Sequence, residues 1–218
     1  MPQFLNCLSS SAHSRRDFFQ AAAASALVLS PVAAAADTGP NVLGQMPGYS
    51  PQIGILISEM TWMRGAVLRA VKGMTLDQLD FLLDNKANRI GALLLHLAAT
   101  EKLYQLNTLG NVKVQDLNKS PAFEDWSVPM NLGEPARQKI KGHDLDHYLN
   151  ILREVREKTL AEFRKRDDQW LLSVDTGFVW GATNNLCKWF HVCEHESHHT
   201  GQISLLATRT PAAKPDNG

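Results

Sequence analysis

The stretch TNNLCKWFHVCEHESHHTGQISLLATR, residues 183–209, decides the fold of this chain. It has no internal proline, and Thr183 can cap its start, so we predict one long helix. Its middle part, HVCEHESHHTGQ (His191 to Gln202), holds four histidines and two glutamates. At 100° per residue, the histidines fall within an arc of about 100° on one side of the helix. Such a face supplies part of a metal site, and a third ligand must come from elsewhere in the chain.

Three other segments predict long helices. Residues 49–71 offer Ser50 as N-cap and Pro51 at the first helical position, followed by apolar residues at i, i+3, i+4 and i+7. Residues 86–110 are apolar around His96 and stop at a glycine. Residues 144–166 carry one apolar stripe opposite charged residues.

The segments between these helices contain turn signals and no convincing strand. Thr75 and Gln78 form a capping box for a short helix over residues 76–83. Residues 111–142 contain prolines and glycines without a sustained period, which indicates a long connection, either a crossover or a lid. The sequence therefore predicts an all-α fold, a four-helix bundle with a long connection between its second and third helices.

The first 36 residues indicate an export signal that does not belong to the folded domain. Arg15 and Arg16 precede an alanine-rich apolar stretch and an A-x-A cleavage site at residues 34–36, as in the twin-arginine signals of bacteria. That apolar stretch is shorter than the ~20 residues that a membrane span needs, and no later apolar segment approaches that length. We expect recognition by the twin-arginine translocation machinery and a periplasmic or extracytoplasmic mature protein without a membrane span. Residues 37–49 are interpreted as a linker and 210–218 as a flexible tail.

Charge and cysteine content exclude several roles. The chain has 22 basic and 22 acidic residues and no run of like charges, so we expect no nucleic-acid partner. The predicted mature chain keeps Cys187 and Cys193, whose Cα atoms would lie about 9 Å apart on one helix, too far for a disulfide. A small-molecule substrate is the expected partner, and a homodimer is left open.

The histidine cluster admits three metal-binding patterns. H-E-x-x-H uses His195 and His199, H-x-x-E-H uses His191 and His195, and H-x-x-x-H takes a third ligand from elsewhere. Both protease patterns expect a downstream ligand. Residues 200–218 contain no Glu and no His, and their one acidic residue, Asp216, lies in the predicted tail. The protease patterns therefore lack their third ligand.

His96 offers the third ligand for the remaining pattern. It is a polar residue in the most apolar part of its predicted helix, where a histidine is often simply hydrogen-bonded in the core. In a bundle it can instead face His195 and His199 across the core. Three histidines with open coordination positions are typical of catalytic zinc, and nickel, iron or manganese also accept such ligands.

These residues also carry a family resemblance. The segment HESHHTGQI (His195 to Ile203), together with His96 followed by Glu101, resembles the DinB/YfiT-like superfamily of metalloenzymes. The last helix of that family typically reads H-x-x-x-H followed by R-G-Q or a near variant. The resemblance implies a four-helix bundle over residues 50–209 and a divalent metal ion held by His96, His195 and His199. Thr200 stands where arginine is frequent, and an export signal is unusual among the better-known members.

The resemblance favours metal-centred chemistry. Characterised relatives include thiol S-transferases and an isomerase that use a low-molecular-weight thiol, which is kept in the cytosol. The predicted export therefore argues against a thiol transferase. We predict a metal-dependent hydrolase or transferase acting on a small substrate, with zinc favoured. The alternative is a non-catalytic bundle with a structural metal or a stress-related role in binding a small ligand.

Roles for the neighbouring polar residues follow from this prediction. Glu196 or Glu101 is the candidate general base or orients a ligand imidazole, unless both are merely solvent-exposed helix glutamates. We predict that His191 and His198 lie at the rim of the metal site or contact its ligands without binding the ion. We assign His143 and His147 to the surface. The aromatic residues are assigned to the core or to the wall of a pocket (Trp180, Trp189, Phe190).

Overall fold

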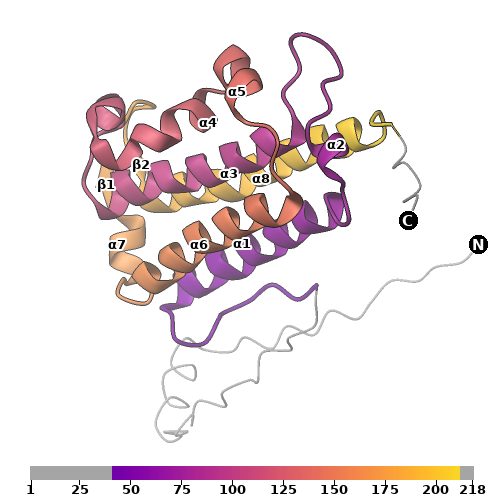
Figure 1. Ribbon diagram of the computed structural model, residues 1–218. Helices are drawn as coiled ribbons and strands as arrows, with labels where there is room; N and C mark the ends of the chain where they lie inside the picture. The colour runs from indigo at the N-terminus through magenta and orange to yellow at the C-terminus, as the bar shows by residue number, and fades with distance from the viewer. Residues whose placement is uncertain (1–40, 212–218) are drawn as a thin grey trace, which may run out of the picture. The chain divides into compact units, whose positions relative to one another are not determined.

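The computed structural model describes residues 41–211, which are mostly helical with one small two-stranded sheet (Figure 1). This confirms the all-α prediction. The predicted export signal, residues 1–36, lies outside the described residues, as does most of the predicted tail. Among the described residues, no helix is both long and apolar enough to cross a membrane.

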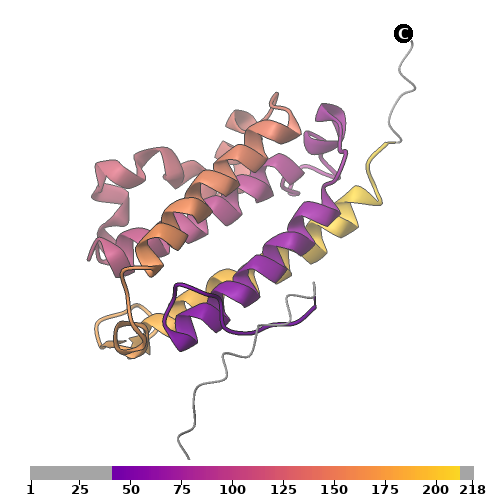
Figure 2. The same ribbon diagram turned by 90° about the horizontal axis from the view of Figure 1, so that it is seen from below.

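The four longest helices correspond to the four predicted ones. They are α1 (Pro51–Ala70), α3 (Ile90–Tyr104), α6 (Leu145–Phe163) and α8 (Asn185–Ala207). Helix α8 packs against α1 and α3, and α3 also packs against α6 (Figures 1 and 2). The segments of α3 and α8 that carry His96, His195 and His199, which are about a hundred residues apart in the sequence, thus lie side by side.

The helix ends differ from the predictions in detail. The N-cap of α8 is Asn184, whose side chain accepts a hydrogen bond from the Cys187 amide, and Thr183 belongs to a strand instead. The predicted capping box of Thr75 and Gln78 is present, but α2 (Leu76–Leu79) ends earlier than expected. Helix α3 continues into a π-helical turn, η1 (Gln105–Leu109), before Gly110.

The predicted long connection folds into short helices. These are η2 (Val114–Lys119), η3 (Pro121–Trp126), α4 (Ser127–Asn131) and α5 (Gly133–Lys139). Helices η3 and α4 pack against α3, so the connection covers the helix that carries His96. It is therefore a folded layer over one ligand helix.

Two small elements between α6 and α8 were not predicted. They are α7 (Asp168–Leu172) and an antiparallel ribbon of β1 (Val174–Asp175) with β2 (Thr183–Asn184). Strands of two residues are too short to show the alternation that identifies strands in a sequence. Asp168 on α7 accepts hydrogen bonds from the Ser50 hydroxyl and the Gln52 amide, and so caps the start of α1.

The segment that was interpreted as a linker contacts α1 in its described part. The Gly44 amide donates to the Ser58 hydroxyl over 3.2 Å. A Cβ added at Gly54 would lie 2.7 Å from the Met46 amide nitrogen, so the close approach of the two backbones requires a glycine there. Residues 41–49 therefore pack along α1.

The apolar core is divided into two clusters by a buried polar layer. One cluster contains Val67, Leu97, Leu152 and Ile203, and the other contains Met60, Tyr104, Phe163 and Val192. Between the two clusters, each long helix contributes one buried charged residue, namely Arg64, Glu101, Arg156 and Glu196. Buried charges are costly unless they are paired, so this layer must be neutralised internally.

Candidate metal centre

Three histidine side chains converge between α3 and α8. The Nε2 atom of His195 lies 2.8 Å from Nε2 of His96 and 3.1 Å from Nε2 of His199. His96 and His199 are buried, and His195 is half-buried. The ligand atoms of this group all lie within 4.8 Å of one another, so the three residues can hold a metal ion.

The opposite ring nitrogens of two of these histidines are fixed by oxygen acceptors. His96 Nδ1 donates to the Pro129 carbonyl over 3.0 Å, and His199 Nδ1 donates to Gln202 Oε1 over 2.8 Å. Because a neutral imidazole carries one N–H, these bonds leave the Nε2 lone pairs facing inward. Ligand histidines in metalloproteins are typically oriented in this way.

Burial keeps these histidines neutral at pH 7. It lowers the pKa of His96 to about 4, and the nearby His199 contributes in the same direction. Burial, followed by the surrounding histidines, lowers the pKa of His195 to about 3. Burial also lowers the pKa of His199. The unprotonated form is the one that binds metal, so the site favours ligation over protonation.

The donor set fits a divalent cation. Neighbouring ligand atoms in a tetrahedral zinc site with bonds of about 2.0–2.1 Å lie about 3.4 Å apart. The observed separations of 2.8 and 3.1 Å are shorter than this by about 0.6 and 0.3 Å, so the rings would move apart by that amount around an ion. Nitrogen ligands of this kind also suit nickel or iron.

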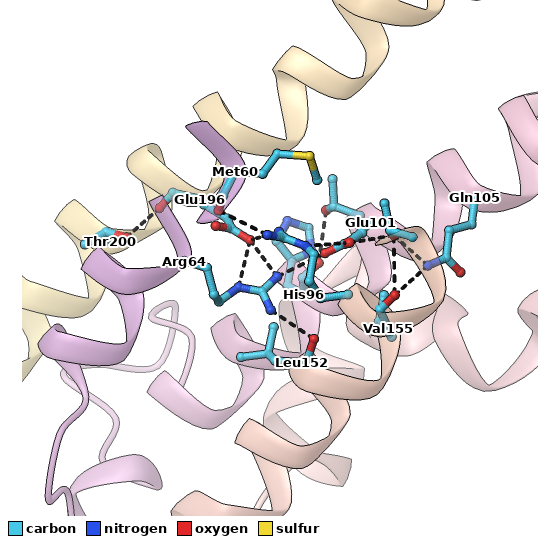
Figure 3. A network of polar contacts seen from close by, with 12 residues as sticks. Met60, Arg64, His96, Glu101, Gln105, Leu152, Val155, Glu196 and Thr200 are labelled. Carbon is cyan, nitrogen blue, oxygen red and sulfur yellow. Dashed lines mark hydrogen bonds and ion pairs between the residues drawn. The ribbon is translucent and has the colours of Figure 1, made fainter. Parts of the chain in front are cut away.

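The predicted general bases lie in a buried ion-pair network, which Figure 3 shows together with His96. Glu101 Oε1 accepts from Arg156 Nε over 2.8 Å and from the Thr159 hydroxyl over 2.6 Å, while Oε2 accepts from Arg64 Nη2 over 3.0 Å. Glu196 Oε1 lies 2.6 Å from Arg64 Nη2 and 3.0 Å from Arg156 Nη2. Two arginines and two glutamates thus neutralise one another.

This network changes the expected behaviour of both glutamates. Burial by itself would raise the pKa of Glu101, but the attraction of Arg156 and Arg64 outweighs it and holds that pKa below its ordinary value. The alternative that both glutamates are solvent-exposed is wrong, since their side chains are 0% and 1% exposed. Their catalytic assignment stays a prediction. The Glu196 Oε2 atom is buried without a hydrogen-bond partner among the described residues.

Sequence reasoning missed four residues that support the centre. Arg64 and Arg156 occupy positions in the apolar stripes of α1 and α6, and that position is the signal that could have identified them. Gln202 lies three residues after His199, which is within reach on a helix. Pro129 acts through its backbone carbonyl, so its residue type carries no signal.

A second group of ligand types borders the centre. His191, Glu194 and His195 also offer ligand atoms within 4.8 Å of one another. His191 Nδ1 lies 2.9 Å from the buried Tyr104 hydroxyl, and its ring is 5.1 Å from that of the exposed Trp180. His198 is exposed on the same helix and contacts Gln202.

The remaining candidates are not part of the three-histidine group. His143 and His147 stack with ring centroids 3.9 Å apart, and His143 is exposed. Trp189 is a core residue, whereas Phe190 is exposed on α8. Cys187 and Cys193 are both free, as their spacing predicts.

The fold and the site together define a helical protein with three convergent histidines that could hold a metal ion. The family model of the DinB family matches residues 50–210, so the chain belongs to the DinB family. The matched range covers all four long helices and the three convergent histidines. No curated protein is similar enough to count as a match.

Proposed function

We propose that this DinB-family chain is an exported metal-dependent enzyme, a hydrolase or transferase, acting on a small substrate. The proposed ligands of the divalent ion are His96, His195 and His199, with zinc favoured and nickel, iron or manganese as other candidates. The observation that carries the proposal is the convergence of three Nε2 atoms, two of them on rings whose Nδ1 atoms are fixed by oxygen acceptors. A metal ion with three protein ligands offers an open position for water or a substrate group, whose pKa it lowers.

The residues around the histidines would position this chemistry. Pro129 and Gln202 fix the rings of His96 and His199. The ion-pair network joins α1, α3, α6 and α8, and so holds the two ligand helices of the proposed four-helix bundle in register. Ligands that are preorganised in this way need little rearrangement when a metal binds.

Glu101 fits a positioning role better than that of a free general base. Both of its oxygens already accept hydrogen bonds from charged or hydroxyl donors. Its attraction to Arg156 and Arg64 stabilises the ionised form, so this carboxylate is a weak proton acceptor. We therefore assign Glu101 to holding the helices together, whereas Glu196, whose Oε2 atom is buried without a hydrogen-bond partner among the described residues, stays the proposed general base.

The same observation favours a second candidate function. With both predicted bases engaged by arginines, the protein has the features of a non-catalytic bundle in which the metal is structural or holds a small ligand. A stress-related binding role belongs to this alternative. Turnover decides between the two candidates, because a binding protein retains ligand without converting it.

The test is an activity screen of the metal-loaded protein against ester, amide and phosphoester substrates, with and without low-molecular-weight thiols. We expect hydrolysis that stops when a chelator removes the metal and returns when zinc is restored. Transfer that requires a thiol would select the transferase. Metal-loaded protein that binds small molecules and converts none would favour the alternative.

We further propose that the twin-arginine signal in residues 1–36 directs the protein to the periplasm or another extracytoplasmic compartment. The twin-arginine route carries folded proteins, which suits a protein that acquires its metal before export. Cell fractionation should recover the shortened protein outside the cytoplasm. An unprocessed cytosolic protein would contradict this placement.

A further inference from the structure

His195 is shared by two groups of metal-ligand type. The inner group consists of His96, His195 and His199, and the outer group consists of His191, Glu194 and His195. The ring centroid of His195 lies 4.9 Å from that of His96 and 5.0 Å from that of His191. His195 therefore stands between the two groups.

The two groups differ in their access to water. His96 and His199 are each 6% exposed. The side chains of His191 and Glu194 are 27% and 50% exposed. A hydrated cation that approaches from solution must exchange its water ligands one after another, and the outer group offers the first protein ligands that it can reach.

The outer group has the features of a ligand set rather than of a hydrogen-bonded pair. His191 Nδ1 lies 2.9 Å from the Tyr104 hydroxyl, and Tyr104 is only 3% exposed, so this contact orients the imidazole. His191 Nε2 is 3.7 Å from Glu194 Oε2, which is too long for a hydrogen bond. That spacing is close to the ~3.4 Å between neighbouring ligands of a tetrahedral ion.

His195 can serve one group at a time. A neutral imidazole has one nitrogen with a free lone pair, since the other carries the proton. An ion held by the outer group therefore has to leave it when His195 binds within the inner group. Movement inward exchanges His191 and Glu194 for His96 and His199 while His195 stays a ligand.

We propose that His191, Glu194 and His195 form a capture site that takes a divalent cation from solution and passes it to the inner histidines through His195. This proposal rests on the inner site of the proposed function. The capture site raises the rate of metal loading and leaves the final stoichiometry at one ion per chain.

The first test measures the rate at which metal-free protein binds cobalt(II), followed by stopped-flow absorbance. His191→Ala and Glu194→Gln should each slow loading by about tenfold, the lower end of the effect seen when a metal site loses a supporting residue. His143→Ala is the control, because it removes an exposed histidine that belongs to neither group. Loading of both outer variants at the rate of His143→Ala would overturn the proposal.

The second test asks whether the outer group binds the ion when the inner group lacks a ligand. His199→Ala removes an inner ligand and keeps the outer group whole, so it should retain weak cobalt binding with a changed absorption spectrum. Adding His191→Ala should abolish that residual binding. Residual binding that is insensitive to His191→Ala, or none at all in His199→Ala, would refute the capture site.

The two proposals fail in distinguishable ways. If His96→Ala binds cobalt as well as the wild type does, but His191→Ala does not bind it, the inner site is wrong and the outer group is the metal site. If His96→Ala abolishes tight binding while both outer variants load normally, the inner site stands and the capture site fails. Circular dichroism of each variant confirms that the helices are retained.

Discussion

The Glu101→Gln variant tests the buried ion-pair network most sharply. The substitution keeps the size of the side chain but leaves Arg64 and Arg156 with Glu196 as their one remaining carboxylate. One buried positive charge is then uncompensated, and breaking a buried pair in this way costs about 3–5 kcal/mol. Because domains of this size are stabilised by about 5–15 kcal/mol, the loss is a large fraction of the total.

Urea denaturation followed by circular dichroism measures this loss. With an m-value of about 2 kcal/mol per molar urea, the midpoint should fall by about 1.5–2.5 M. The matched control is Glu157→Gln on α6, since Glu157 pairs with Arg153 and both side chains are more than half exposed. That variant should change stability by less than about 1 kcal/mol.

A double variant separates charge from packing. Glu101→Gln combined with Arg156→Met leaves Arg64 and Glu196 as a neutral pair. It should be less destabilised than the sum of the two single variants, because the one remaining arginine, Arg64, keeps Glu196 as its carboxylate. If Glu101→Gln lowers the urea midpoint no more than Glu157→Gln does, the reasoning about the network is refuted.

Three further predictions concern the neighbouring residues. Burial lowers the pKa of His96 from 6.5 to about 4, so this histidine binds fewer protons in the folded state than in the unfolded state. The metal-free protein should therefore lose stability as the pH falls from 6.5 towards 4. In urea titrations, His96→Gln should reduce the dependence of the unfolding free energy on pH, and an unchanged dependence would contradict the assignment. Gln202→Leu frees the ring of His199 and should weaken zinc binding by about 10- to 100-fold in calorimetry, whereas an unchanged affinity would show that Gln202 does not orient the ligand. Gly54→Ala places a methyl group against the Met46 backbone and should release residues 41–49 to limited proteolysis, and an unchanged digestion pattern would count against their packing on α1.

The long helices and the histidine triad could be predicted from local patterns. Helical periodicity and helix-start signals such as Pro51 at the first helical position are properties of adjacent residues, and His195 and His199 share a helix face whatever the tertiary structure. His96 was identified because a polar residue in an apolar helix needs a partner in the core. The pairing of α3 with α8 then followed from the expectation of a bundle.

The parts that were missed depend on tertiary contacts. Glu101 and Glu196 look like surface glutamates until Arg64 and Arg156 are brought to them by helix packing. The two-residue strands are held by pairing with each other, so they have no local signal. Pro129 contributes a backbone carbonyl, which every residue possesses.

Metal analysis of the purified protein tests the central claim most directly. Elemental analysis should find one divalent ion per chain in the wild type and in His143→Ala, and none in His195→Ala. His195 is the decisive position because its Nε2 atom lies next to those of both His96 and His199. A wild-type protein without stoichiometric metal, or a His195→Ala variant that binds metal as well as the wild type, would contradict the account.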